Sequence, residues 1–313
     1  MTTVAAHTTL RVDIAVCTFR RAALAQTLAS LAWLTVPDSV RLRVIVADND
    51  VEPSARARVD AARSLLPIDI VYVHCPAGNI SIARNACLDE ADADFIAFVD
   101  DDETVEPQWL DRLLAEADRT GADAVLGPVR ALYRPDAPRW MCDGDFHSTR
   151  PVWVDGEIRT GYTCNVLMRL AAPSIAGRRF DLALGRSGGE DTAFFDQVHA
   201  AGGRIAFAEK AWVHEPVPAA RARFSWLAQR RLRMGQTHGH LLAARHAGAA
   251  RLGAAGLAAA KCGVCFAGAT ALFFRPVRRN RLLLRGLLHA GAVGGLAGAR
   301  AIEPYGQLEA TVR

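Results

Sequence analysis

The sequence predicts an α/β protein with a mainly parallel central sheet flanked by helices. Three observations support this fold class. Short apolar runs alternate with helical segments over about the first 120 residues. Polar residues directly follow several of these runs. After Ala122 the predicted strands become shorter and are separated by Pro and Gly, which predicts a mixed-sheet portion in the second half.

The first half contains four strand–helix repeats. Each strand is short and apolar, and each is followed by a polar break and a segment with helical periodicity. Such alternation predicts parallel strands joined by right-handed crossovers. The strands are expected at 12–16, 42–47, 69–74 and 95–99, and the helices at 22–34, 53–65, 81–89 and 107–119.

The second half is predicted to be less regular and to end in long helices. Strands are expected at 124–133, 152–154, 163–168 and 204–213, and helices at 190–201 and 224–246. We expect five parts, which are a tail (1–10), two halves of one globular domain (11–120 and 121–220), a basic amphipathic helix (221–248) and apolar helices (249–313).

Composition limits the partners and the compartment. The formal net charge of +4 is too small to argue for nucleic acid. Lys210 and Lys261 are the only lysines, so arginine carries nearly all of the positive charge. A guanidinium suits bidentate phosphate recognition, although genome composition also explains this bias. Seven cysteines, an odd number, favour a reduced, cytosolic setting.

The apolar C-terminal part predicts association with a membrane. Segment 252–274 is long enough to span a bilayer, for which about 20 residues suffice, whereas 282–299 is interrupted by Arg285 and His289. We expect helices lying on or partly within the membrane, with the arginines of 275–281 on anionic cytoplasmic headgroups. The alternative is an Ala/Gly-rich hairpin packed on the globular domain.

Acidic residues mark a candidate metal site. Asp100, Asp101 and Asp102 follow the buried strand 95–99, and their mutual repulsion is best offset by a cation. Asp100 and Asp102 point to the same side of an extended segment and form a D-x-D pair suited to Mg²⁺. The alternatives are a solvated acidic turn or a cap for the helix beginning near Pro107.

Further polar residues are expected at the same edge of the sheet. Thr18 and Arg20 follow the first strand, and Asp48 and Asn49 follow the second. Because ligands of open α/β sheets bind beyond the carboxyl ends of the strands, these residues and the aspartates should line one crevice. No G-x-G-x-x-G motif or P-loop lysine follows the first strand, which argues against a dinucleotide or P-loop fold.

A second acidic pair, Glu190-Asp191, opens the helix expected at 190–201. Adjacent acids at a helix N-terminus interact favourably with the helix dipole, so a capping role is one explanation.

Five motifs in order resemble family 2 glycosyltransferases with the GT-A fold. The resemblance covers roughly residues 11–240. The cluster Phe98-Val-Asp-Asp-Asp-Glu103 with Trp109-Leu110 is similar to the polysaccharide-assembly members that extend lipid-linked repeat units, including succinoglycan-type glucosyltransferases. The motifs are Cys17-Thr-Phe-Arg20-Arg21, Asp48-Asn49, the segment from Gly78-Asn79 to Ala83-Arg84-Asn85, Asp100-Asp101-Asp102-Glu103 with Trp109-Leu110, and Glu190-Asp191.

The resemblance implies a nucleotide-sugar site in the 11–120 half and an acceptor site in the 121–220 half. Asp48 would accept from the uracil of a UDP-sugar, Asp100 would contact the ribose, and Asp102 would hold Mg²⁺ or Mn²⁺ at the diphosphate. The implied donor-binding residues are Thr18, Arg20, Asp48, Asn49, Arg84, Asp100, Asp101, Arg230 and Arg233. Asp100 and His214 are the further implied metal ligands.

The resemblance also implies a mechanism. Asp191, beside Glu190, would be the general base, and attack opposite the leaving group would invert the anomeric centre. Arg230-x-x-Arg233-Met234 is similar to the Q-x-x-R-W element of processive synthases, but Arg230 and Met234 depart from it. That departure, with no multispan channel in the sequence, favours adding one sugar per encounter.

The expected partners are a UDP-sugar, a glycan or lipid-linked acceptor and the cytoplasmic face of the plasma membrane. Trp140 and Asn165 are expected to contact the acceptor. Two alternatives remain at this point. A nucleotidyltransferase would usually offer a glycine-rich phosphate loop with a lysine, and a non-catalytic carbohydrate-binding assembly protein would tolerate loss of Glu190-Asp191.

Overall fold

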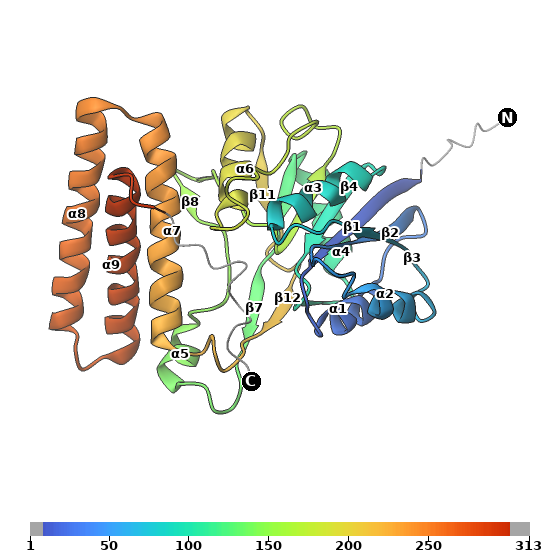
Figure 1. Cartoon of the computed structure of the whole chain (residues 1–313), viewed down its shortest axis with the longest axis horizontal. Coiled ribbons are helices and arrows are strands. Elements are labelled where there is room, and N and C mark those ends of the chain that lie inside the picture. The colour runs from blue at the N-terminus through green and yellow to red at the C-terminus, as the bar shows by residue number, and fades with distance from the viewer. Residues whose placement is uncertain (1–8, 301–313) are drawn as a thin grey trace. The chain divides into compact units, whose positions relative to one another are not determined.

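The computed structural model describes residues 9–300, and Figure 1 shows its elements. Most of the predicted tail (1–10) and the last part of 249–313 lie outside the described residues. The chain divides into two compact units. The first comprises the chain up to Arg130, Thr149–Arg186 and Glu190–Glu215, and the second comprises Ala131–Ser148, Ser187–Gly189 and the chain from Pro216 onward.

The first unit is built on a seven-stranded mixed sheet with the order β11-β6-β10-β4-β1-β2-β3. Strands β4, β1, β2 and β3 are parallel, as predicted, and β10 is antiparallel to both β4 and β6. The register places Thr18 opposite Asp48 at the carboxyl ends of their strands. The strands are β1 (Leu10–Thr18), β2 (Val40–Asp48), β3 (Asp69–His74), β4 (Phe95–Val99), β6 (Ala124–Leu126), β10 (Asn165–Arg169) and β11 (Ile205–Phe207).

Helices cover both faces of this sheet because successive strand residues point to opposite sides. In β1, Val12, Ile14 and Val16 share one core cluster with α1, α2 and α4, whereas Ala15 shares the other with α3 and α6. The predicted helices of the first unit are all present, as α1 (Leu24–Leu31), α2 (Arg56–Arg63), α3 (Ile80–Glu90), α4 (Trp109–Thr120) and α6 (Glu190–Ala200).

Two predicted strands were wrong in their extent. The strand expected at 124–133 divides into β6 and β7 (Val129–Leu132) at Gly127-Pro128, where proline offers no backbone N–H for a ladder. The strand expected at 204–213 divides into β11 and β12 (Val213–Pro216). Ala211 N–H bonds Ala208 C=O in the turn between them, so the chain leaves the sheet there.

Short strands complete the β structure. β5 (Thr104–Val105), which directly follows the acidic motif, pairs antiparallel with β12. β8 (Trp153–Val154) and β9 (Glu157–Ile158) form a hairpin. Both of its turn residues have positive φ, 52° at Asp155 and 82° at Gly156, which is the pattern of a two-residue type I′ turn.

The second unit is helical, with α5 (Arg139–Gly144), α7 (Phe224–Arg245), α8 (Gly248–Ala271) and α9 (Pro276–Leu296). Figure 1 shows α9 between α7 and α8. A Cβ atom at Gly235, Gly239, Gly291 or Gly295 would collide with the backbone of the facing helix. These four glycines therefore allow α7 and α9 to pack closely.

In the described part of the chain, α8 is the one helix whose length and composition would allow it to cross a membrane. One of its faces packs through Ala258, Cys265 and Ala269, which are buried. Leu252 and Val264 are 75% and 73% exposed. The two predicted apolar segments therefore differ in burial. The first forms α8, which is mostly exposed, and the second forms α9, which packs against both α7 and α8.

Candidate active site

The carboxyl ends of β1 and β4 form the first part of the site. The Thr18 hydroxyl donates to Asp101 Oδ2 at 2.7 Å, and Arg21 lies 3.8 Å from both Asp101 Oδ1 and Asp102 Oδ2. Burial, with a smaller contribution from the charge of Asp102, raises the pKa of Asp101 to about 7. A largely buried, weakly compensated carboxylate therefore lies where the sheet topology places ligands.

The end of β2 is more completely bonded. Asp48 is fully buried, and its oxygens accept from the N–H groups of Asp50 and Ala55 and from the Tyr72 hydroxyl. Arg20, which has φ of 54°, donates through Nε to both oxygens of Asp50 at 2.9 Å. The sequence interpretation missed Asp50 and Tyr72, although Asp50 is the third residue of the Asp-Asn-Asp motif.

Asn49 is the exception at this strand end. The residue is 4% exposed, and its Oδ1 atom has no hydrogen-bond partner among the described residues. A buried acceptor of this kind is costly unless a ligand or water satisfies it. The role of Asn49 in donor binding stays a prediction.

A buried ion pair joins the two halves of the candidate site. Arg84 Nη1 of α3 donates to Glu190 Oε1 of α6, and both side chains are less than 10% exposed. Burial alone would lower the pKa of Arg84, but the charges of Glu190, Asp191 and Asp100 raise it well above its ordinary value. Arg84 therefore stays charged, and it lies within electrostatic reach of acids that are far apart in the sequence.

Asp191 is the residue after Glu190 in the first turn of α6. Burial and the charge of Glu190 raise the pKa of Asp191 to about 6, while Arg84 and the Thr192 N–H oppose the shift. The Thr192 N–H donates to Asp191 Oδ1 at 2.6 Å. The Asp191 side chain is only partly buried and interacts electrostatically with Asp100. A carboxylate with a pKa near neutrality can accept a proton efficiently at physiological pH.

Asp100 of the D-x-D pair also belongs to a cluster of possible metal ligands that the sequence did not predict. Ligand atoms of Asp100, Glu103 and Cys164 all lie within 4.8 Å of one another. Glu103 Oε2 accepts the Asp100 N–H at 3.0 Å, and burial followed by the charge of Asp100 raises the pKa of Glu103 well above its ordinary value. Glu103 is thus a buried acid that holds the turn carrying the aspartates.

The residues present fit a divalent cation with oxygen ligands. Asp100 and Asp102 are partly exposed, whereas Asp101 and Glu103 are buried, so exposure alternates along the motif as a D-x-D pair requires. Mg²⁺ and Mn²⁺ both prefer carboxylate and water ligands. His214 is not a member of the Asp100, Glu103 and Cys164 cluster, and its Nε2 lies 3.3 Å from Glu106 Oε1. Its role as a metal ligand stays a prediction.

Asn165 is not placed to contact an acceptor. It is fully buried, its Oδ1 accepts from the Trp109 indole, and its Nδ2 donates to the carbonyls of Pro128 and Ala211. We therefore correct the predicted acceptor contact. Asn165 joins β10 to the start of α4 and to the chain before β12.

The other predicted residues lie in the second unit. Trp140 on α5 makes edge contacts with Phe146 at a ring distance of 5.1 Å. The Arg230 guanidinium of α7 lies over the Trp226 ring at 5.3 Å. Arg233 is also on α7. The roles expected for Trp140, Arg230 and Arg233 stay predictions.

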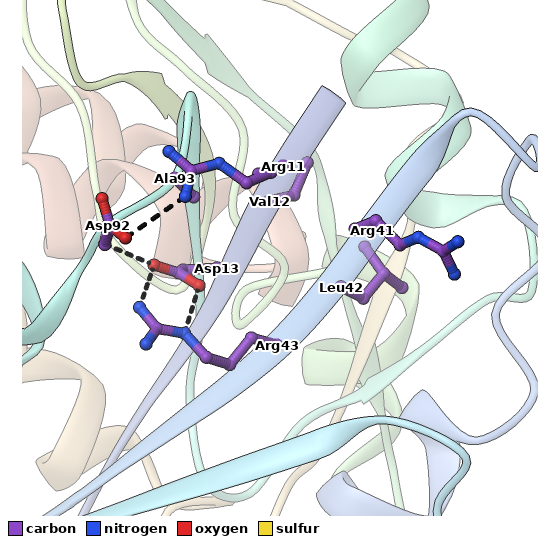
Figure 2. Close-up of a pocket in the computed structure, with 8 residues that line it drawn as sticks. All are labelled: Arg11, Val12, Asp13, Arg41, Leu42, Arg43, Asp92 and Ala93. Atoms are coloured by element: carbon purple, nitrogen blue, oxygen red, sulfur yellow. Dashed lines mark hydrogen bonds and ion pairs between the residues drawn. The ribbon is translucent and has the colours of Figure 1, made fainter. Parts of the chain in front are cut away.

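A pocket at the opposite end of the strands carries no such chemistry. Figure 2 shows it beside the first residues of β1 and β2. Both oxygens of Asp13 accept from Arg43, at 2.8 and 2.7 Å, and Asp13 Oδ2 also accepts the Asp92 N–H. The charge of Asp13 is thus compensated by Arg43 of the same chain.

Comparison with known proteins shows the family. The family model described as glycosyl transferase family 2 matches residues 13–174. The chain is 61% identical over 303 residues to the succinoglycan biosynthesis protein ExoM of Rhizobium meliloti, covering 97% of this chain and 98% of that one. The chain therefore belongs to glycosyl transferase family 2, and it is a glycosyltransferase. The nucleotidyltransferase and non-catalytic alternatives are set aside.

Solved structures show the fold. A mannosyltransferase from Pyrobaculum calidifontis, in complex with GDP-Man and Mn²⁺, is similar with a TM-score of 0.63 and 18% identity, covering 93% of this chain and 88% of that one. S. aureus TarS 1–349, in complex with UDP-GlcNAc, gives a TM-score of 0.52 and 21% identity over 67% of this chain and 59% of that one. The predicted GT-A fold is confirmed.

Proposed function

We propose that this glycosyltransferase moves a sugar from a UDP-sugar to a hydroxyl of a glycan or lipid-linked acceptor, with inversion and one sugar per encounter. The observation that carries the proposal is the Arg84–Glu190 ion pair. It joins the helix after β3 to the helix that bears Asp191, and both Arg84 and Asp191 interact electrostatically with Asp100.

Asp191 acts as the general base in this proposal. With a pKa of about 6, it is mostly ionised at pH 7 and can take the proton of the acceptor hydroxyl. The acceptor oxygen then bonds to the anomeric carbon as the bond from that carbon to the diphosphate breaks. Attack opposite the leaving group inverts the centre, so an α-linked donor gives a β-glycoside.

Residues at the strand ends hold the donor. Asp100 and Asp102 would hold Mg²⁺ or Mn²⁺, which when bound supplies charge neutralisation to the departing diphosphate. Asp48 is the proposed acceptor of a uracil N–H. Because it is fully buried and already accepts three hydrogen bonds, a uracil would reach it only if these internal partners moved. Thr18, Arg20, Asn49 and Asp101 complete this pocket, Arg84 lies near the base or diphosphate, and Arg230 and Arg233 are proposed diphosphate contacts.

A pair of substitutions tests this assignment. Nucleotide release from UDP- and GDP-sugars is measured with Mn²⁺ and with membranes from cells lacking the chain as the acceptor source, and UDP binding is measured by calorimetry. Asp102→Ala should abolish Mn²⁺-dependent UDP binding. Asp191→Asn should bind UDP normally and lose about 10²- to 10⁴-fold in transfer, the usual contribution of a general base. Full turnover by Asp191→Asn would overturn the base assignment.

We further propose a role in exopolysaccharide assembly. The support is the 61% identity to a succinoglycan biosynthesis protein over nearly the whole of both chains. Expression of this chain in R. meliloti lacking ExoM should restore succinoglycan, whereas Asp191→Asn at the same expression level should not. If the wild-type chain is expressed in the mutant and no polysaccharide returns, the two proteins do not share donor, acceptor and linkage.

We also propose that the second unit binds the cytoplasmic face of the plasma membrane. Beside the exposed face of α8, Phe273 and Phe274 are 69% and 61% exposed, and arginines follow at 275, 278 and 279. Apolar side chains next to cations suit an interface with anionic headgroups.

Vesicle binding tests this surface. Val264→Glu should weaken flotation with vesicles containing anionic phospholipid, because a carboxylate would enter the apolar face of α8. Val152→Glu is the matched control, since Val152 is 68% exposed and lies in the first unit. Equal flotation of wild type and both variants would contradict the proposal.

A further inference from the structure

The segment before α6 is held by the side chains of α3. The Asn85 amide of α3 bonds the backbone of Phe180, Ser81 Oγ donates to Asp181 C=O at 2.8 Å, and Asn79 Nδ2 donates to Leu182 C=O at 2.9 Å. These partners are about 100 residues apart in the chain. The motif that contains Arg84 therefore does more than supply one arginine.

Asn85 makes the most specific of these contacts. Its Nδ2 donates to Phe180 C=O at 2.9 Å, and its Oδ1 accepts the Phe180 N–H at 2.8 Å. Both backbone groups of one residue are thus bonded by one side chain. A primary amide has the donor and acceptor that this arrangement needs, whereas an ionised carboxylate of the same shape only accepts.

Phe180 connects three elements of the candidate site. Its buried ring stacks on Phe194 of α6 at 4.3 Å and meets Phe98 of β4 edge-on at 6.2 Å. The Arg84 guanidinium lies 5.6 Å from the same ring. Phe194 is one helical turn after Asp191, and Phe98 is two residues before Asp100.

We infer that Asn85 is a positioning residue, which fixes Phe180 and through it sets Asp191 relative to Asp100. The inference rests on the proposed role of Asp191 as the base. Asn85 is bonded to the backbone of Phe180 and not to the carboxylates, so it acts through the packing of α6. A displaced base lowers the rate of the chemical step, and about 1 Å of displacement can cost about 10²-fold.

The test compares Asn85→Ala and Asn85→Asp with a control on the same helix. Asp89 of α3 pairs with Arg179, the residue before Phe180, at 2.6 Å, but both side chains are exposed. Asp89→Ala removes this surface contact between the same two segments and should leave kcat within about twofold of wild type.

Asn85→Ala should lower kcat about 10- to 100-fold while KM for the donor and the Kd for UDP with Mn²⁺ change less than about twofold. The acidic limb of its pH–rate profile should also move, since the surroundings of Asp191 change. Asn85→Asp should lose as much kcat, because one oxygen would face the Phe180 carbonyl. A general loss of folded protein would lower the amplitude of the profile without moving its limb.

Two results would overturn the inference. One is a folded Asn85→Ala with wild-type kcat and profile, and the other is an equal kcat loss in Asp89→Ala. If Asn85→Ala does not fold, Ser81→Ala is the second variant, because it removes a single hydrogen bond between α3 and the segment before α6. It should lower kcat about threefold and move the acidic limb of the pH–rate profile. An unchanged kcat in Ser81→Ala would also overturn the inference. Asp191→Asn in the same assay separates the proposals, since its full turnover refutes the base itself.

Discussion

Buried aspartates at the two ends of the parallel strands differ in how closely a positive charge approaches them. At the amino end, Arg43 donates to both oxygens of Asp13, from Nε at 2.8 Å and from Nη2 at 2.7 Å (Figure 2). At the carboxyl end, Asp101 accepts from the neutral Thr18 hydroxyl, and its nearest arginine, Arg21, is 3.8 Å away. Two carboxylates with similar burial therefore have very different compensation.

We interpret Asp13 as a structural charge and Asp101 as a functional one on the basis of this difference. At the amino end the chain supplies the countercharge itself. At the carboxyl end acids gather, and burial raises the pKa of Asp101 to about 7 and of Asp191 to about 6. Perturbed carboxylates in this arrangement are typical of sites where a ligand or cation completes the electrostatics. If this difference is real, substitutions at the two ends should change stability and activity in different ways.

Asp13→Ala should have the largest effect on folding. Removing one partner of a buried ion pair usually costs about 3 to 5 kcal/mol, and we expect the lower end because the Arg43 side chain is 29% exposed. Urea unfolding measures the loss, and Kd for UDP should stay at its wild-type value. A variant as stable as wild type would show that this pair is not a structural anchor.

Asp101→Asn should instead stabilise the protein. Because the folded pKa of about 7 exceeds the ordinary value of 3.8, the folded state binds more protons between these pH values, and stability falls as pH rises through them. At pH 8 without divalent cations, the neutral amide should gain about 1 to 3 kcal/mol, and the gain should vanish near pH 3. An equal gain at both pH values would contradict the charge explanation.

The rate should follow the ionisation of Asp191. A base must be unprotonated, so kcat/KM should reach a plateau above about pH 7 and fall about tenfold per unit below the pKa of about 6. The profile should be measured with the wild-type chain at constant ionic strength. A rate that stays flat from pH 5 to 8 would rule out Asp191 as the group that limits the acidic limb.

Arg11→Ala should have the smallest effect. Arg11 pairs with Asp92 at 3.2 Å at the amino end, but the two side chains are 53% and 81% exposed. Solvent and salt screen such pairs, so we expect less than about 1 kcal/mol in urea unfolding. A loss comparable to that of Asp13→Ala would mean that exposure does not decide which contacts at this end matter.

Much of the fold could be predicted because its signals are local. The strands 69–74 and 95–99 were predicted with the bounds of β3 and β4, since each is a short apolar or alternating run between polar breaks. The division at 124–133 has a local signal in Pro128, which the predicted strand ran through. The division at 204–213 has no such signal, because it depends on the turn at Ala208–Ala211 and on the pairing of β12 with β5.

The places of Thr18, Asp101 and the acids at the start of α6 could be predicted, because these residues follow predicted strands or open a predicted helix. Their roles in the candidate site stay predictions. The predicted contact of Asn165 with the acceptor was wrong, because its burial against Trp109 depends on packing that has no sequence signal. No separate role for Glu103 was predicted from the sequence, because its hydrogen bond with the Asp100 N–H depends on how the turn after β4 folds.

The order of strands and helices, and the edge of the sheet at which the acids lie, could be inferred from the amino-acid sequence without coordinates. These follow from residue type and spacing along the chain. The tertiary structure alone decided which charges meet, such as Arg84 with Glu190 and Asp13 with Arg43. The physical reason is that pairing and desolvation depend on distances of a few ångströms between segments that the folded backbone brings together.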